Sequence, residues 1–173
     1  MPKSDQGITK DRYMLIPRTA IFARRGDEYL LIKGAPSKKL WAGKYNGIGG
    51  HVERGENILF SAQRELMEET GLQADLWLCG TVIVDAGETG ICLFVFCGEN
   101  VQGEIKASEE GAVEWVKKAR VEQSRNDAVL HLPVVEDLPI LLERIDSMKR
   151  GDPPFSARSY YDENDKLKVV FGE

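Results

Sequence analysis

The chain has 173 residues, of which 42% are hydrophobic and 29% are charged, a composition typical of a soluble globular protein with one sizeable core. A net charge of −5 argues against broad nonspecific binding of nucleic acid, which requires a basic surface. No stretch approaches the ~18 apolar residues of a membrane-spanning helix, and the polar start MPKSDQGITKDR lacks the apolar segment of a signal peptide. We therefore expect one domain over residues 1–173, as a monomer or homodimer without membrane or nucleic-acid partners.

The cysteines, Cys79, Cys92 and Cys97, have no CxxC spacing and lie in apolar runs. This pattern predicts buried free thiols rather than a metal or redox site. Free thiols suit a reducing compartment, so we expect a cytoplasmic protein.

The N-terminal part predicts a flexible end followed by a hairpin. Residues 1–12 are charged, and we expect them to be flexible. Residues 13–23 are strand-like, although Pro17 indicates an edge, a bulge or a break there. A turn at residues 25–28 leads into the apolar strand YLLIK, and residues 34–44 have no period and predict a loop.

A glycine-rich turn then leads into an acidic helix, predicted over residues 57–70, with Gly71 as its C-terminal stop. Leu59, Ala62 and Leu66 recur at helical spacing, and we expect them to face the core. Three glutamates share one arc of roughly 100° on this helix. Close carboxylates repel one another, whereas a divalent cation such as Mg²⁺ would turn the repulsion into a binding site. The alternative is a solvated acidic helix without chemistry. The three glutamates are Glu65, Glu68 and Glu69.

The second half mixes strand and helix signals, with no internal repeat and no linker. Residues 99–110 are polar and predict a loop, and residues 117–128 predict one short helix or none. Strands flanking a central helix indicate an α+β fold or an α/β/α sandwich. The other expected elements are strands at 72–84, 90–97 and 112–116, a helix within 133–148 with Leu138, Leu141, Leu142 and Ile145 inward, and an appended C-terminal hairpin within residues 152–173.

The stretch GHVERGENILFSAQRELMEETGL, residues 50–72, resembles the Nudix box. It has Gly50, five residues, Glu56, seven residues, and then R-E-L-x-E-E-x-G-L. Every fixed position and both spacings are filled. The resemblance implies a mixed β-sheet between helices with the Nudix loop-helix motif, and hydrolysis of a diphosphate linkage with Mg²⁺, for which Mn²⁺ is a possible substitute.

The resemblance also implies roles for individual residues. The metal ligands would be Glu65, Glu68, Glu69 and the carbonyl of Gly50, with Glu65 as one candidate general base among several. Arg64 would pair with Glu56 and brace the loop against the helix. Without the motif, Arg64 would be a solvated cation and Glu56 a carboxylate favoured by the helix dipole.

A further metal ligand in such enzymes often comes from a loop outside the box. Glu109 and Glu110 precede the strand at 112–116, in a position that resembles the corresponding loop of nucleoside triphosphate diphosphatases. We favour Glu110. The alternative is that both are solvated loop residues.

The approach to the box, WAGKYNGIGG, resembles that of diphosphatases that hydrolyse oxidised purine triphosphates such as 8-oxo-dGTP, with Tyr45 in place of the usual tryptophan. Asn46 occupies the position of a base-reading asparagine, and its amide can both donate and accept. Its alternative role is that of a turn residue. We assign Gly49 and Lys33 to substrate binding as well. Lys38, Lys39 and Lys44 either meet phosphate or are surface lysines.

One departure concerns base recognition. Related enzymes can place paired aspartates after a tryptophan before the last helix, whereas this chain has Leu132-Pro133-Val134-Val135. Glu136 and Asp137 follow, either as substitutes for that pair or as acids of a first helical turn. His51 is expected to approach phosphate, and His131 to be a packing or surface residue.

Together these features predict Mg²⁺-dependent hydrolysis of a nucleoside triphosphate, with an oxidised purine as the leading substrate, to a nucleoside monophosphate and pyrophosphate. The alternative enzyme is an ADP-ribose or nucleotide-sugar pyrophosphatase. The alternative of another class is a noncatalytic nucleotide-binding module, which the loss of a box glutamate would favour; none is lost.

Overall fold

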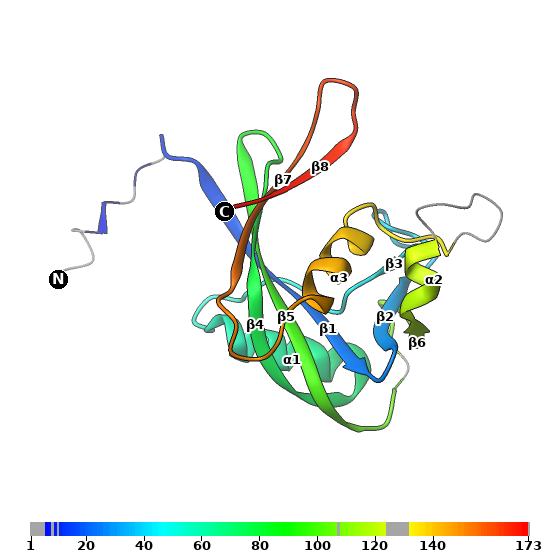
Figure 1. Cartoon of the computed structure of the whole chain (residues 1–173). Coiled ribbons are helices and arrows are strands. Elements are labelled where there is room, and N and C mark those ends of the chain that lie inside the picture. The colour runs from blue at the N-terminus through cyan, green and yellow to red at the C-terminus, as the bar shows by residue number, and fades with distance from the viewer. Residues whose placement is uncertain (1–5, 8, 10, 107, 124–131, 173) are drawn as a thin grey trace.

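The structure of the chain, a computed structural model, describes residues 6–7, 9, 11–106, 108–123 and 132–172. Its centre is a mixed sheet in the order β3-β2-β1-β5-β4-β7-β8, with β6 paired to β2 (Figure 1). The expected α+β fold with a mixed sheet is therefore confirmed. The elements are β1 Met14–Arg25, β2 Glu28–Gly34, β3 Tyr45–Asn46, α1 Ile58–Thr70, β4 Leu72–Val84, β5 Thr89–Gly103, β6 Gly111–Lys117, α2 Lys118–Gln123, α3 Leu138–Asp146, β7 Phe155–Tyr161 and β8 Leu167–Phe171.

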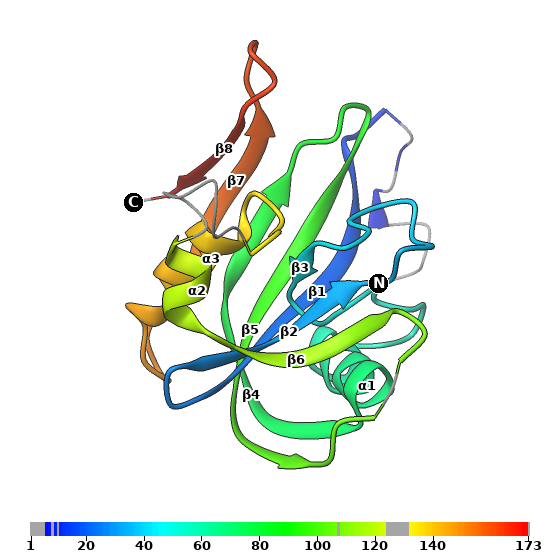
Figure 2. The same cartoon turned by 90° about the vertical axis from the view of Figure 1, so that its right-hand side faces the viewer.

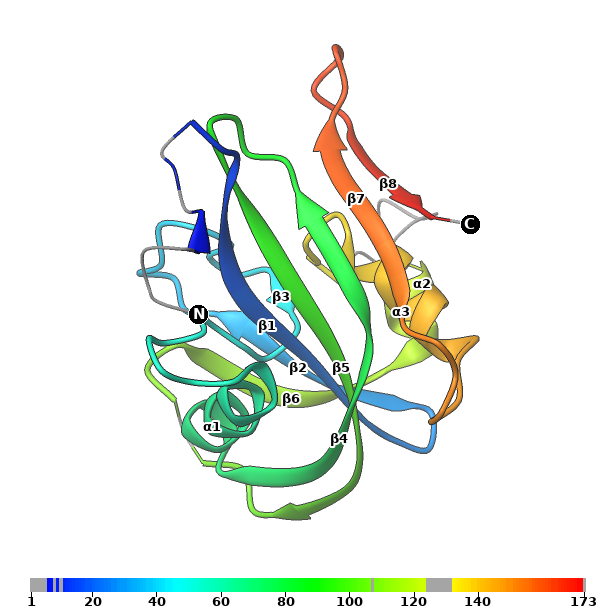
Figure 3. The ribbon, with the colours of Figure 1, turned by 90° about the vertical axis from the view of Figure 1, so that its left-hand side faces the viewer.

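Helices α1 and α3 lie on opposite faces of the strands (Figures 2 and 3). Side chains alternate between the faces of a strand, so Ile21 and Phe22 of β1 enter different cores. Ile21 packs in the cluster that contains Ala62 of α1. Phe22 packs in the cluster that contains Leu138, Leu141, Leu142 and Ile145 of α3, all four buried as predicted. The sequence therefore forms layers of helix, sheet and helix.

Of the three expectations at Pro17, the edge position is confirmed, whereas strand β1 has neither a bulge nor a break there. Pro17 pairs with Cys92 of β5 on one side. On the other side its carbonyl accepts a hydrogen bond from the backbone N–H of Val52 at 3.1 Å. The nitrogen and carbonyl of one strand residue point the same way, so the missing N–H of Pro17 faces this loop, and the β5 ladder loses no donor.

Helix α1 has the predicted ends. Asn57 accepts a hydrogen bond from the backbone N–H of Phe60, and Gly71 has φ 73°, with its N–H bonded to the carbonyl of Met67. The prediction for Leu59 was wrong, because this side chain is 41% exposed whereas Ala62 and Leu66 are buried. Leu59 has nearly the same angular position as the buried Leu66, so its exposure is due to its place in the first turn of the helix and not to its angle.

Two other expectations need correction or extension. Strand β5 continues to Gly103, so the first part of the expected loop 99–110 is strand that pairs with the start of β4. Its polar residues lie at the exposed end of the sheet. Helix α2 occupies the start of the segment with mixed signals, and residues 124–128 lie outside the described residues.

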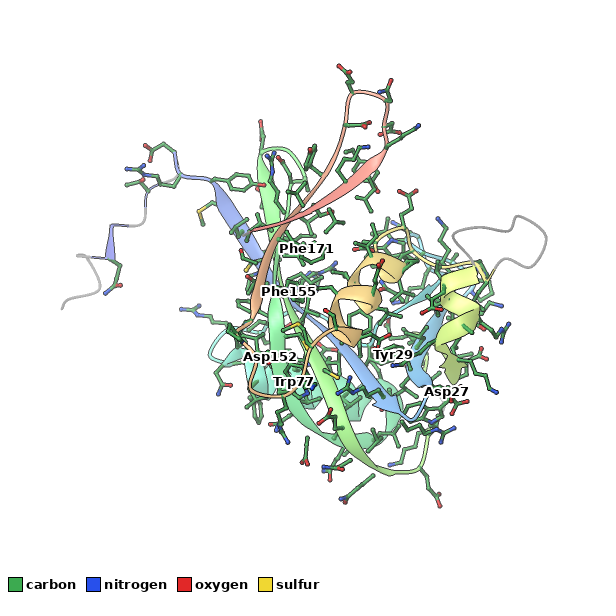
Figure 4. The ribbon with its side chains drawn as sticks, viewed as in Figure 1. Asp27, Tyr29, Trp77, Asp152, Phe155 and Phe171 are labelled. Carbon is green, nitrogen blue, oxygen red and sulfur yellow. The ribbon has the colours of Figure 1, made fainter. Side chains whose placement is uncertain are left out.

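The C-terminal hairpin is present and extends the large sheet, because β7 pairs in parallel with β4. The rings of Phe155 and Phe171 meet edge to face, 5.4 Å apart, which fixes the two strands to each other (Figure 4). All three cysteines are free; Cys79 and Cys97 are buried, as predicted, and Cys92 is half-buried. None of the helices in the described part of the chain is long and apolar enough to cross a membrane.

Candidate active site

Arg64 is the centre of an ion-pair cluster on α1. Its Nε donates to Glu56 Oε1 at 2.7 Å, and its Nη1 donates to Glu65 Oε1 and Glu68 Oε2, both at 2.9 Å. The side chains of Glu56 and Glu65 are 13% exposed, whereas that of Glu68 is 61% exposed. The predicted pair of Glu56 and Arg64 is thus present, and the same guanidinium also orients two box glutamates.

This cluster ties the loop after Gly50 to the helix. The carbonyl of His51 accepts hydrogen bonds from Arg64 Nη2 and Ser61 Oγ, both at 3.2 Å, and Glu56 closes the turn by accepting the backbone N–H of Glu53. The bond from Arg64, with that from Glu53, lowers the pKa of Glu56 to about 2. Glu56 is therefore ionised across the physiological pH range and keeps the loop in place.

Two glycines allow the loop to approach both β1 and the box carboxylates. Gly49 has φ 145°, and a Cβ there would lie 2.2 Å from the carbonyl oxygen of Thr19. A Cβ on Gly50 would lie 2.5 Å from Glu65 Oε1. The carbonyl of Gly50 accepts the N–H of Thr19 at 2.9 Å and keeps a second lone pair. Only glycine leaves this space between backbone and carboxylate.

Glu69 is a largely buried box carboxylate with a raised pKa. It accepts the backbone N–H of Gly49 at 3.0 Å. Burial raises its pKa to about 7, and the charges of Glu65 and Glu68 add to this, against the lowering effects of the Gly49 hydrogen bond and Lys38. A carboxylate whose ionised form is disfavoured by burial and by neighbouring negative charges gains most from a nearby cation.

The residues fit a hard divalent cation. The donors are carboxylate and carbonyl oxygens, the ligand type that Mg²⁺ prefers, and the space beside Gly50 lies against the Glu65 carboxylate. Within the described residues, no three His, Cys, Asp or Glu side chains already converge on one point. Arg64 Nη1 is hydrogen-bonded to both Glu65 and Glu68, so these two carboxylates lie beside the same guanidinium.

Glu110 reaches the same region from the loop before β6. Its carboxylate forms an ion pair with Lys38, and its carbonyl accepts the N–H of Ala35 at 3.0 Å. Glu110 lines the cavity described next, whereas Glu109 does not. Of the two candidates, Glu110 is the one that lines the cavity, and its role as a metal ligand stays a prediction.

One cavity of about 970 Å³ connects the box with the sheet face under α3. One end contains Glu65, Glu68, Glu69 and Glu110. The other end is largely apolar and is lined by Phe22, Val84, Leu93, Leu138, Leu141 and Tyr161. The volume is ample for a nucleotide, and the two ends differ as a phosphate group and a base would require.

A model of the NUDIX domain matches residues 14–138, which include the whole box. The chain belongs to the Nudix family. Over 110 residues it is 34% identical to the oxidized purine nucleoside triphosphate hydrolase of Danio rerio, a match that covers 61% of this chain and 70% of that protein. The protein of the same name from Mus musculus is 34% identical over 88 residues, covering 49% of this chain and 56% of the mouse protein.

Solved structures have the same fold. The Mutator MutT protein from Bacillus halodurans superposes with a TM-score of 0.70 at 25% identity, covering 91% of this chain and 97% of that one. The MutT protein from Methanosarcina mazei Go1 superposes with a TM-score of 0.65 at 24% identity, covering 78% and 95% of the two chains, and supports the fold.

Of the residues predicted to bind the substrate of this Nudix enzyme, Asn46 and Gly49 line the cavity and Lys33 does not. Asn46 lines the cavity, and its Oδ1 also accepts the N–H of Gly47 at 2.8 Å, so it is both a turn residue and a cavity residue. Gly49 lines the cavity too. Lys33 does not; its ammonium lies over the ring of Tyr45, 5.5 Å from the centroid. Tyr45 itself is buried and donates its hydroxyl hydrogen bond to Glu114.

The acids before α3 also reach the cavity. Asp137 occupies the N-cap position of α3, but its side chain makes no capping hydrogen bond. Burial raises the pKa of Asp137, and the charge of Glu136 raises it further. Both acids line the cavity. They are therefore cavity-lining acids, Asp137 makes no capping hydrogen bond, and a role of either acid toward the substrate stays a prediction.

Sequence reasoning missed Arg18, which lines the cavity from β1. Its Nε donates to Nε2 of His51 at 3.1 Å. In the sequence, Arg18 alternates with Ala20 and Phe22 and so belongs to the same face of the strand. That pattern does not show that the loop with His51 lies beside it. His131 lies outside the described residues.

Proposed function

We propose that this Nudix enzyme hydrolyses a nucleoside triphosphate with an oxidised purine base, releasing a nucleoside monophosphate and pyrophosphate. The observation that carries the proposal is the cavity whose lining includes both the box glutamates and a group of apolar side chains, with Asn46 and Asp137 in its wall. The printed names of the zebrafish and mouse relatives, oxidized purine nucleoside triphosphate hydrolase, support the same substrate class.

The metal end would bind Mg²⁺, with Mn²⁺ as the expected substitute, through Glu65, Glu68, Glu69, Glu110 and the carbonyl of Gly50. A bound Mg²⁺ would neutralise phosphate charge and lower the pKa of a bound water. Glu56 and Arg64 have no contact with the substrate in this proposal. They hold the loop and orient Glu65 and Glu68.

At the base end, the proposal assigns recognition to Asn46 and Asp137. An amide presents a donor and an acceptor together, and a carboxyl group with a raised pKa can be a donor as well as an acceptor. Oxidation at C8 of a purine turns an acceptor nitrogen into an N–H donor and adds a carbonyl acceptor. A wall with both kinds of polar group can distinguish the two forms.

The cellular setting is part of the proposal. A small nucleotide is the only partner that the site requires, whether the enzyme is a monomer or a homodimer. The three free cysteines are in keeping with a cytoplasmic location.

A substrate screen tests this function. Purified protein with Mg²⁺ is incubated with ordinary and oxidised dNTPs, ADP-ribose and nucleotide sugars, and released pyrophosphate and monophosphates are measured. The proposal expects the highest kcat/KM for an oxidised purine triphosphate, with pyrophosphate as product. A preference for ADP-ribose or a nucleotide sugar would reject the substrate but retain the diphosphatase chemistry. Absence of hydrolysis of every compound would favour a noncatalytic module.

A further inference from the structure

Arg18 is a cation in the cavity wall that neither the box nor the ion-pair cluster uses. Strand alternation places it on the same face as Ala20 and Phe22, and its register partner on β5 is Leu93, which also lines the cavity. The side chain is half-buried. Among the described residues, Arg18 has no carboxylate partner.

The other cations near the site differ from Arg18. Lys38 is paired with Glu110, and Arg64 is paired with three glutamates and does not line the cavity. Lys39 and Lys44 are exposed. Arg18 therefore differs from these cations in combining a place in the cavity wall, partial burial and no carboxylate partner among the described residues.

The hydrogen bond to His51 aims the guanidinium. Nε donates to His51 Nε2 at 3.1 Å, while the His51 backbone is held by Ser61 and Arg64. This leaves both terminal nitrogens of Arg18 without a protein partner among the described residues. Two parallel N–H groups of a guanidinium match two oxygens of one phosphate.

The position of Arg18 lies between the two ends of the cavity. Its side chain is on the sheet face that carries Phe22 and Leu93, at the apolar end. The next residue, Thr19, donates its N–H to the carbonyl of Gly50, at the metal end. A polyphosphate running from the base to the glutamates would pass this point.

We infer that Arg18 binds a phosphate of the substrate through its terminal nitrogens, and that His51 is the positioning residue for Arg18. This inference rests on the proposed function. Because the contact recognises charge and oxygen geometry, the loss of affinity on substitution is the same for guanine and adenine nucleotides.

The first test uses inorganic pyrophosphate with Mg²⁺ as the probe and measures its Kd by calorimetry. Arg18→Gln keeps a donor for His51 but loses the charge and the fork, so its Kd is expected to rise about tenfold or more, the magnitude of charge-assisted hydrogen bonds. Arg18→Lys is expected to be intermediate. Arg54→Gln is the matched control, because Arg54 is an exposed cation of the same loop region that does not line the cavity. Equal affinity of Arg18→Gln and Arg54→Gln, or a wild type without affinity for pyrophosphate, overturns the inference.

The second test separates positioning from folding. His51→Ala is expected to raise KM for the triphosphate severalfold with little change in kcat, and His51→Gln, which retains a side-chain acceptor, is expected to restore KM in part. Equal KM values for His51→Ala and wild type would refute the positioning role. The thermal unfolding midpoint of each variant shows whether it is folded.

The two proposals fail in different ways. If the wild type hydrolyses no nucleoside triphosphate but Arg18→Gln still loses pyrophosphate affinity, the proposed function fails and the phosphate site stands. If the wild type hydrolyses a triphosphate and Arg18→Gln has unchanged KM and pyrophosphate affinity, the function stands and the phosphate site fails.

Discussion

At the scale of the residue, Glu69 combines burial, one backbone hydrogen bond and a pKa raised to about 7. Glu69→Gln retains the size of the side chain and an acceptor for Gly49, but removes the charge that a metal needs. We expect kcat to fall by about two orders of magnitude or more, as when a preorganised electrostatic group is lost from a site. Steady-state kinetics at saturating Mg²⁺ measure this, with Glu163→Gln in the β7–β8 turn as the control. Normal turnover by Glu69→Gln would reject the site assignment.

The raised pKa of Glu69 should also make the stability of the metal-free protein depend on pH. The ordinary pKa of 4.5 rises to about 7 in the folded state, so between these values the folded state binds more protons than the unfolded state. Protonation of Glu69 therefore contributes fully to the stability of the folded state below about pH 4.5, and this contribution is lost as the pH rises through 7. In EDTA, the melting temperature of the wild type should therefore fall relative to that of Glu69→Gln between pH 5 and 8. Parallel curves for the two proteins would contradict this.

Residues also differ in how well the sequence predicts them. The pair of Glu56 and Arg64 can be predicted because the two residues are only eight positions apart, one just before α1 and the other in its second turn. The bond between Arg18 and His51 depends on a loop crossing a strand 33 residues earlier, and no local pattern contains that. The same applies to Lys33, whose alternation in β2 turns it toward Tyr45 and away from the cavity.

At the scale of the element, the loop over residues 51–56 is rigid only if its contacts with α1 persist. Glu56 closes the turn at Glu53 and binds Arg64, so Glu56→Gln removes the charge from both contacts. We expect faster amide hydrogen exchange in this loop and a lower kcat, with the melting temperature little changed. Glu68→Gln is the matched control for exchange, because it removes another partner of Arg64 and leaves the pair with Glu56 intact. Equal exchange in both variants would mean that the pair does not hold the loop.

Elements with their own end signals were predicted well. The caps of α1 at Asn57 and Gly71 are local, and so is the C-terminal hairpin turn. A break at Pro17 and a loop at 99–103 were wrong, whereas the edge position of Pro17 was right, because strand pairing decides all three. Pro17 directs its missing N–H toward a loop, and the polar end of β5 is held by the start of β4. Pairing partners far along the chain override such local preferences.

At the scale of the whole molecule, the two faces of one sheet have separate tasks. Helix α1 supplies the glutamates from one face, and β1, β5 and α3 enclose the base end on the other. A substitution at one end should therefore leave the chemistry at the other end unchanged.

We expect Asn46→Ala and Asp137→Asn to change the ratio of kcat/KM between an oxidised purine triphosphate and its ordinary counterpart by about tenfold, the scale set by one or two hydrogen bonds to a base. The Mg²⁺ concentration for half-maximal rate should stay the same, because among the described residues neither side chain is hydrogen-bonded to a box glutamate. Asp152→Asn makes the same chemical change as Asp137→Asn at a turn outside the cavity, near the foot of β7 (Figure 4), and should alter neither quantity. Equal losses for both substrates would show that Asn46 and Asp137 support the cavity without reading the base, and a shifted Mg²⁺ requirement would show that the two ends are coupled through the sheet.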